Sequence, residues 1–137
     1  MANTKKVKRF VIDVNSFSSI FIKRDTDWLL HYITRNRIEI FVDDLLIEEL
    51  TSVLSYPKIK KILPLDAILY ISFVRMVSTQ IISNSHQVKC PDPDDDYLFD
   101  IALSAHAKLL VTGEKALLNW SESPVEIISL SMFKKLF

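Results

Sequence analysis

The chain has 137 residues, almost half of them hydrophobic, and a single glycine. These totals predict one folded domain with a compact core, spanning residues 1–137, and exclude a disordered or loop-rich protein. The 17 basic and 17 acidic residues balance to a net charge of zero, so overall charge does not indicate a nucleic-acid partner.

The sequence also indicates the cellular location of the protein. It has no run of about 18 uncharged apolar residues, so no membrane span is expected. The apolar run near the N-terminus is too short for a signal peptide. A lone cysteine, Cys90, excludes an internal disulfide framework and fits a reducing compartment. We therefore expect a cytoplasmic protein with no membrane partner.

Short strand-like runs alternate with helical patterns along the chain. This alternation predicts an α/β fold with a parallel sheet covered on both faces. In chain order the prediction is a strand at 9–13, a helix at 17–35 interrupted near 25–27, a strand at 38–42, helices at 45–55, 58–63 and 64–82, a strand at 87–89, a helix at 95–107, strands at 109–112 and 125–128, and a helix at 131–137.

The densest charge lies in CPDPDDDYLFD, residues 90–100. Four carboxylates fall within five positions there, namely Asp92, Asp94, Asp95 and Asp96. Aspartate is a good helix N-cap and a favourable neighbour of the positive end of a helix. Four acids exceed what capping requires, however, and like charges this close repel one another unless something neutralises them. A divalent cation would do so.

Other acids are predicted at the same edge of the sheet. Asp13 ends the first strand, Glu114 follows the strand LLVT, and Asp95 and Asp96 begin the helix before that strand. In open parallel sheets, sites form outside the carboxyl ends of the strands. Glu49 lies within the helix after the second strand. Taken alone, each acid reads as a cap, a turn residue or a surface charge, so the prediction depends on their common edge.

Clustered carboxylates without a supporting histidine or cysteine arrangement suit a hard cation such as Mg²⁺ or Mn²⁺. Such ions serve phosphoryl transfer, because they stabilise charge on the phosphate. The same acids would repel a polyanionic substrate in the absence of metal. Thr112 and Asn15 could orient the carboxylates, although strand-end hydrogen bonding is an equally good interpretation of both.

Three stretches together resemble the PIN-domain ribonucleases, in particular those that are toxin components of bacterial type II toxin–antitoxin pairs. They are VIDVNSFSSIFI, IEELTSVLSYPKI and PDPDDDYLFDIALSAHAKLLVTGEKALL. The resemblance implies a three-layer α/β/α fold with a parallel sheet of about four or five strands. It also implies cleavage of RNA phosphodiester bonds with Mg²⁺ or Mn²⁺.

The resemblance further implies which residues form the site. The family's four acids fall on Asp13, Glu49, Asp95 and Glu114, which would be both catalytic and metal-binding. Glu114 departs from the pattern, since the family usually has aspartate after Thr-Gly. The resemblance does not rank the remaining acids of the run. Asp96 is predicted as a further metal ligand, and Asn15, Thr112 and Asp92 as supporting residues.

Two other readings remain. A PIN-like module with a weakened site would bind RNA or protein without cleavage, and Glu114 is its one support. A flavodoxin-like phosphoacceptor domain would need a lysine at the end of a later strand, and Lys115 is poorly placed for that. The resemblance implies an antitoxin partner and a homo-oligomer. The apolar segment 62–82 permits contact with either.

Overall fold

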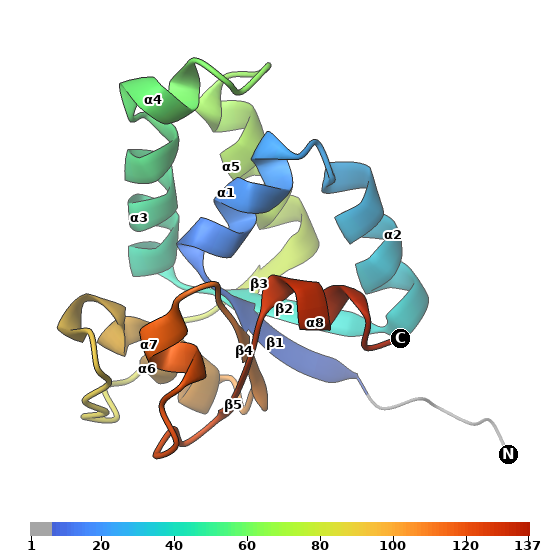
Figure 1. The fold of residues 1–137 in the computed structure, drawn as a ribbon. Coiled ribbons are helices and arrows are strands. Elements are labelled where there is room, and N and C mark those ends of the chain that lie inside the picture. The colour runs from blue at the N-terminus through green and yellow to red at the C-terminus, as the bar shows by residue number, and fades with distance from the viewer. Residues whose placement is uncertain (1–6) are drawn as a thin grey trace, which may run out of the picture.

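A computed structural model describes residues 7–137, and residues 1–6 lie outside the described residues. Its centre is a five-stranded parallel sheet with the order β3-β2-β1-β4-β5 (Figure 1). This confirms the predicted α/β class and the parallel sheet. The strands are β1 Lys8–Ile12, β2 Ile38–Val42, β3 Ser78–Gln80, β4 Leu109–Val111 and β5 Glu126–Ile128.

Helices cover both faces of the sheet, as the three-layer prediction requires (Figure 1). The larger layer contains α1 Val14–Ile22, α2 Thr26–Asn36, α3 Asp44–Leu54, α4 Pro57–Lys60, α5 Ala67–Val77 and α8 Leu130–Lys134. The opposite layer contains the 3-10 helix η1 Pro93–Asp95, α6 Asp96–Ser104 and α7 Lys115–Leu118. Within residues 7–137, no helix has the length and apolar character that a membrane crossing requires.

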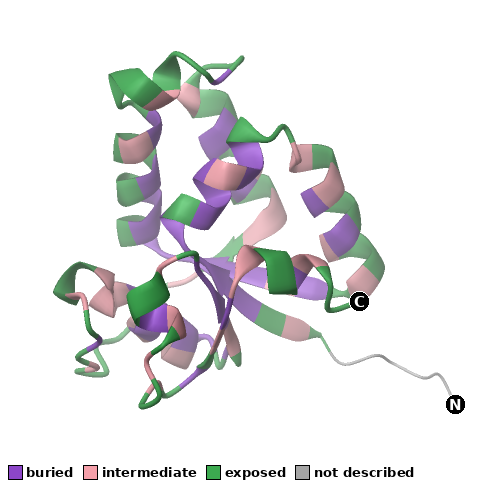
Figure 2. Cartoon of the chain, viewed as in Figure 1, coloured by how far each residue is buried: buried purple, intermediate pink, exposed green. Residues whose placement is uncertain are grey.

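The hydrophobic core lies on both faces of the sheet, where buried residues occupy the strands and the inward sides of the helices (Figure 2). Strands buried on both faces carry continuous apolar runs, and β1 does so from Phe10 to Ile12. Phe10 meets Phe133 of α8 edge to face, with ring centroids 5.2 Å apart. The Tyr32 hydroxyl of α2 donates to the Phe133 carbonyl, so the C-terminal helix is fixed to the larger layer.

Two predicted elements are wrong. The helix predicted over 64–82 is confined to α5, and the chain then enters β3 at Ser78. The strand predicted at 87–89 is irregular. Ser78 and Thr79 pair with Ile40 and Phe41 on the open edge of β2, and helical periodicity carries no information about that pairing. The apolar run also does not predict burial beyond the strand, because Ile82 is 93% exposed.

The connections place a topological switch point between β1 and β4. The chain moves from β1 to β2 and β3 on one side, and returns over the opposite face through α6 to pair β4 with the other side of β1. Asp13 and Thr112 directly follow these two neighbouring strands. Ligands of open parallel sheets bind at such a crevice, outside the carboxyl ends of the strands.

Candidate metal centre

A cavity of about 220 Å³ lies at the carboxyl edge of the sheet. Six carboxylate side chains line it, although they come from segments that are far apart in the sequence. They are Asp13, Glu49, Asp92, Asp94, Asp95 and Glu114, and the neutral lining residues include Asn15 and Tyr97. We call this the acidic pocket. The structure therefore brings together the four acids that the sequence singled out.

Asp13 is the most rigidly held of these acids. It is 4% exposed and caps α1, with Oδ1 accepting a hydrogen bond of 2.7 Å from the Ser16 amide. Its Oδ2 accepts from the hydroxyl of Thr112. Burial raises the pKa of Asp13, although these donors oppose the shift. Each carboxylate oxygen has two lone pairs, so both oxygens can still accept from a ligand in the pocket.

Thr112 joins the two strand ends. It is fully buried, and its Oγ1 also accepts a hydrogen bond of 3.1 Å from the Glu114 amide. Glu114 directly precedes α7, but its side chain makes no capping hydrogen bond there. The Glu114 carboxylate is thus directed to the pocket and not to the helix.

Three acids form the tightest group within the pocket. One oxygen each from Asp92, Asp95 and Glu114 lies within 4.8 Å of the other two. The Asp95 Oδ2 atom is buried and has no hydrogen-bond partner among the described residues. Burial, followed by the neighbouring Glu114, Asp92 and Asp13, raises the pKa of Asp95 to about 8.

An unpartnered carboxylate oxygen among other acids is costly in a protein interior, and it needs either a proton or a cation. The donors here are all hard oxygen atoms, which suit Mg²⁺ or Mn²⁺. The residues therefore fit the divalent ion that the sequence predicts.

The remaining acids of the run lie in different places. Asp94 lines the acidic pocket and is exposed, whereas Asp92 also caps η1 by accepting from the Asp94 amide. Asp96 lines a separate cavity, and its Oδ1 accepts a hydrogen bond of 2.9 Å from the Cys90 amide. Of the five predicted metal ligands, Asp96 is thus the one that the structure does not bring to the pocket.

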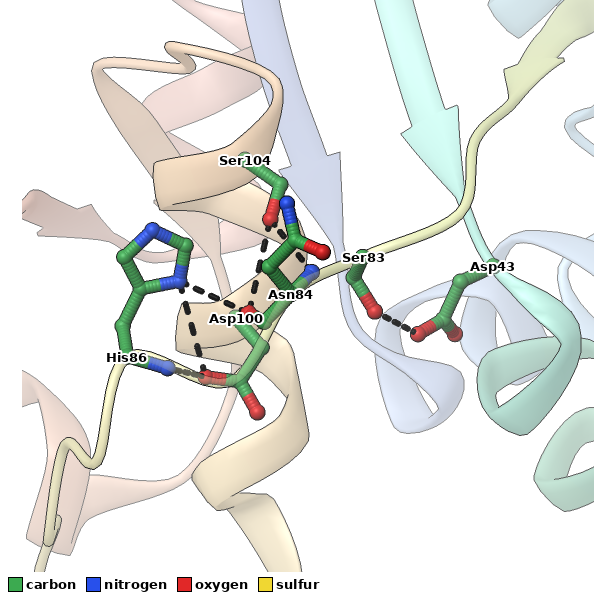
Figure 3. Close-up of polar contacts among 6 residues, drawn as sticks. All are labelled: Asp43, Ser83, Asn84, His86, Asp100 and Ser104. Carbon is green, nitrogen blue, oxygen red and sulfur yellow. Dashed lines mark hydrogen bonds and ion pairs between the residues drawn. The ribbon is translucent and has the colours of Figure 1, made fainter.

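Glu49 lines the pocket from α3 and is exposed there. The start of α3 is held by the buried Asp43. Asp43 is 4% exposed, and its Oδ1 caps α3 by accepting from the Leu46 amide at 2.9 Å. Its Oδ2 accepts a hydrogen bond of 2.7 Å from the hydroxyl of Ser83 (Figure 3). The sequence indicates the cap, but it gives no sign of the contact with Ser83.

The segment that carries Ser83 also binds α6 (Figure 3). The Asn84 amide donates to Ser104 Oγ at 2.9 Å, and the His86 amide donates to Asp100 Oδ1 at 2.8 Å. Residues 83–86 therefore connect the start of α3 to α6. The first helix supplies Glu49 to the pocket, and the second begins directly after Asp95.

Tyr97 also lines the pocket, and the sequence did not indicate this. A tyrosine in an amphipathic helix is normally interpreted as a core residue. Tyr97 lies in the first turn of α6. Burial raises its pKa, and Glu49, Asp95, Asp13 and Asp43 raise it further. Its hydroxyl consequently stays neutral and can donate a hydrogen bond within the pocket.

Comparisons with known proteins bear on the fold and on the family. A crystal structure of PAE2754 from Pyrobaculum aerophilum is similar, with a TM-score of 0.60 over 94% of this chain and 88% of that chain. The identity is 16%, so the likeness concerns the fold alone. No curated protein matches the chain. A family model described as the PIN domain matches residues 9–116, and PIN domains are generally nucleases. The chain therefore belongs to the PIN domain family, which implies a nuclease-type function.

Proposed function

We propose that the protein is a metal-dependent endoribonuclease that hydrolyses RNA phosphodiester bonds at the acidic pocket. The observation that carries the proposal is the group formed by Asp92, Asp95 and Glu114, in which Oδ2 of Asp95 is buried and unpartnered among the described residues. A carboxylate group of this kind takes up either a proton or a cation, and the nuclease-type family favours the cation. Mg²⁺ or Mn²⁺ is the proposed cofactor.

Asp13, Glu49, Asp95 and Glu114 would hold the ion, with Asp92 beside them. When bound, the ion would supply Lewis-acid stabilisation of the charge that develops on a phosphodiester. Thr112 and Ser16 fix the orientation of the Asp13 carboxylate through its two oxygens. This preorganisation means that Asp13 need not reorient when the ion binds.

Two neutral groups at the pocket can donate hydrogen bonds to a substrate. The Tyr97 hydroxyl is a neutral donor, and Asn15 is exposed at the start of α1 with an amide that can donate to a phosphate oxygen. The six carboxylates repel a polyanion until a cation offsets their charge. Activity should therefore depend strictly on the divalent ion.

The direct test is cleavage of a mixed structured RNA by purified protein with Mg²⁺, with Mn²⁺ and with chelator. Asp95→Asn and Glu49→Gln should lose cleavage. Glu48→Gln is the matched control, because Glu48 is the exposed neighbour of Glu49 and does not line the pocket. Circular dichroism verifies that each variant is folded. Cleavage that persists in chelator or in Asp95→Asn would contradict the proposal.

A second candidate is a weakened module that binds RNA or protein without cutting it. Glu114 favours it, because the family usually has aspartate there and the longer side chain approaches Asp95 closely enough to raise the pKa of that acid. Glu114→Asp separates the two candidates. If the native protein binds RNA but is inactive with every divalent ion, and Glu114→Asp restores cleavage, the weakened module is the correct reading.

We further propose that the protein is the toxin of a toxin–antitoxin pair and forms a homo-oligomer. The support for an interface is a row of exposed apolar side chains along α5 and the loop before it. Leu65 is 54% exposed, Ile68 71% and Met76 66%. Light scattering should show an oligomer that Ile68→Glu dissociates. Growth arrest on expression, relieved by a co-expressed neighbouring gene product, would support the toxin assignment.

A further inference from the structure

A second cavity, of about 520 Å³, lies at the opposite edge of the sheet. It is lined by the first residues of β1 and β4, by the turn between α6 and β4, and by the C-terminal residues. Asp13 lies just beyond the other end of β1. Five residues of strand at about 3.3 Å each separate the two sites by roughly 16 Å. The amino-edge cavity is therefore distinct from the acidic pocket.

The apolar part of this cavity runs from buried side chains to side chains that the described residues cover only in part. Phe10 is buried at its base, and Leu109 is partly buried beside it. At the rim, Val7 is 53% exposed and Phe137 is 49% exposed. A concave, largely apolar site of about 300–1,000 Å³ with a few polar groups is the usual form of a small-molecule pocket.

The polar part is uniformly basic. Lys8, Arg9, His106 and Lys108 line the cavity, and no acidic side chain does. Two of these groups have partners. Lys8 Nζ donates to the Asn36 carbonyl at 3.2 Å and lies 4.5 Å from the centroid of the Phe137 ring. Arg9 Nη1 donates to the Ala105 carbonyl at 3.1 Å, and Arg9 Nε forms an ion pair of 4.0 Å with Glu39.

The other two basic side chains are available. Within residues 7–137, neither the Lys108 ammonium nor the His106 imidazole has a hydrogen-bond or ion-pair partner. They lie two positions apart in the short connection between α6 and β4, and both line the cavity. Two such donors suit one anionic group, whereas a peptide with repeated acids would need a row of cations.

We propose that the amino-edge cavity binds an apolar organic carboxylate. Its hydrocarbon body would lie against Phe10, Leu109 and Phe137, and its carboxylate would accept hydrogen bonds from Lys108 and His106. The charge of the lining favours an anion, because no acidic side chain lines the cavity and the basic side chains of Lys108 and His106 have no ion-pair partner within residues 7–137. Hydrogen bonds to a charged group are stronger than neutral ones, so Lys108 should contribute strongly to affinity.

The test is a titration of the full metal-free chain with decanoate, below its micelle concentration, followed by amide NMR. We expect saturable shifts at Phe10, Leu109 and Phe137 and none at Asp13. Decylamine, which has the same chain length and the opposite charge, should bind more weakly. Lys108→Glu should weaken decanoate binding by about tenfold or more, and Lys108→Gln by less.

Lys60→Glu is the matched control, because it makes the same charge change on exposed α4 and should leave the affinity unchanged. The NMR spectrum itself reports whether each variant is folded. Absence of saturable shifts, equal binding of decylamine, or unchanged affinity in Lys108→Glu would each overturn the proposal. Displacement of decanoate by an acidic peptide at lower concentration than by any carboxylate would overturn the assignment to a small ligand. The test involves no metal and no RNA, so it stands independently of the proposed nuclease activity.

Discussion

Thr112→Val offers a sharp test of how the strand ends form the acidic pocket. Valine matches the shape of threonine at this fully buried position but lacks the hydroxyl. The substitution removes the donor to Asp13 Oδ2 and the acceptor of the Glu114 amide. A hydrogen bond to a charged group contributes about 1.5–3 kcal/mol, and a neutral one about 1 kcal/mol. We therefore expect Thr112→Val to lower the free energy of unfolding by about 2–4 kcal/mol.

Thr112→Ser is the control, because it keeps the hydroxyl and loses only a methyl group, at a cost of about 1 kcal/mol. Urea denaturation measures the free energy of unfolding of both variants. The free energy of unfolding of a domain is about 5–15 kcal/mol, so both variants should remain folded and the difference between them should be measurable. If the valine variant were no less stable than the serine variant, the hydrogen bonds of Thr112 would not be what fixes Asp13.

Four further predictions concern the acidic pocket and its surroundings. The pKa of Asp95 is raised to about 8, so its contribution to metal-free stability is fully present below the unfolded value near 3.8 and is lost as pH rises toward 8. Asp95→Asn should accordingly gain stability over the native protein as pH rises in chelator, and parallel denaturation curves at all pH values would refute this. Binding of Mn²⁺ to the native protein should release a proton near neutral pH, measurable by calorimetry in buffers of different ionisation enthalpy. Ser83→Ala should lower the free energy of unfolding by about 1–3 kcal/mol, because it leaves Asp43 Oδ2 unpaired. It should also speed amide hydrogen exchange in residues 83–86. Ser85→Ala, at an exposed neighbouring position, should have neither effect. Burial raises the pKa of the Cys90 thiol to about 12, so iodoacetamide should label it only after unfolding; rapid labelling of the native protein would show that the thiol is accessible.

Much of this protein is determined by local sequence. The run Phe10–Val11–Ile12 is apolar without alternation, which is typical of a strand covered on both faces, and Asp13 after it both ends the strand and caps the next helix. Parallel strands bring their carboxyl ends to one edge, so acids that follow different strands could be predicted to meet. The five-stranded parallel sheet and its two helical layers are confirmed.

Only the tertiary structure shows which of two neighbouring acids lines the pocket. Asp95 and Asp96 are adjacent and chemically identical, yet the first lines the acidic pocket and the second binds the Cys90 amide. Asp95 ends the 3-10 helix η1 and Asp96 begins α6, so the position of this junction on the sheet decides which acid faces the pocket. The sequence also cannot show that Asp43 meets Ser83, because that hydrogen bond joins residues 40 positions apart.

Local pattern therefore determined which acids follow strands, which segments are apolar and where most helices begin, since these depend on contacts a few residues apart. Tertiary structure alone decided that Ser78–Gln80 is a strand, because the open edge of β2 supplies its partner. It also decided that Thr112 fixes Asp13, and that the first residues of β1 and β4 meet the C-terminus around an apolar, basic cavity. These features depend on surfaces that come together only when the sheet is assembled, and no window of sequence contains both sides of them.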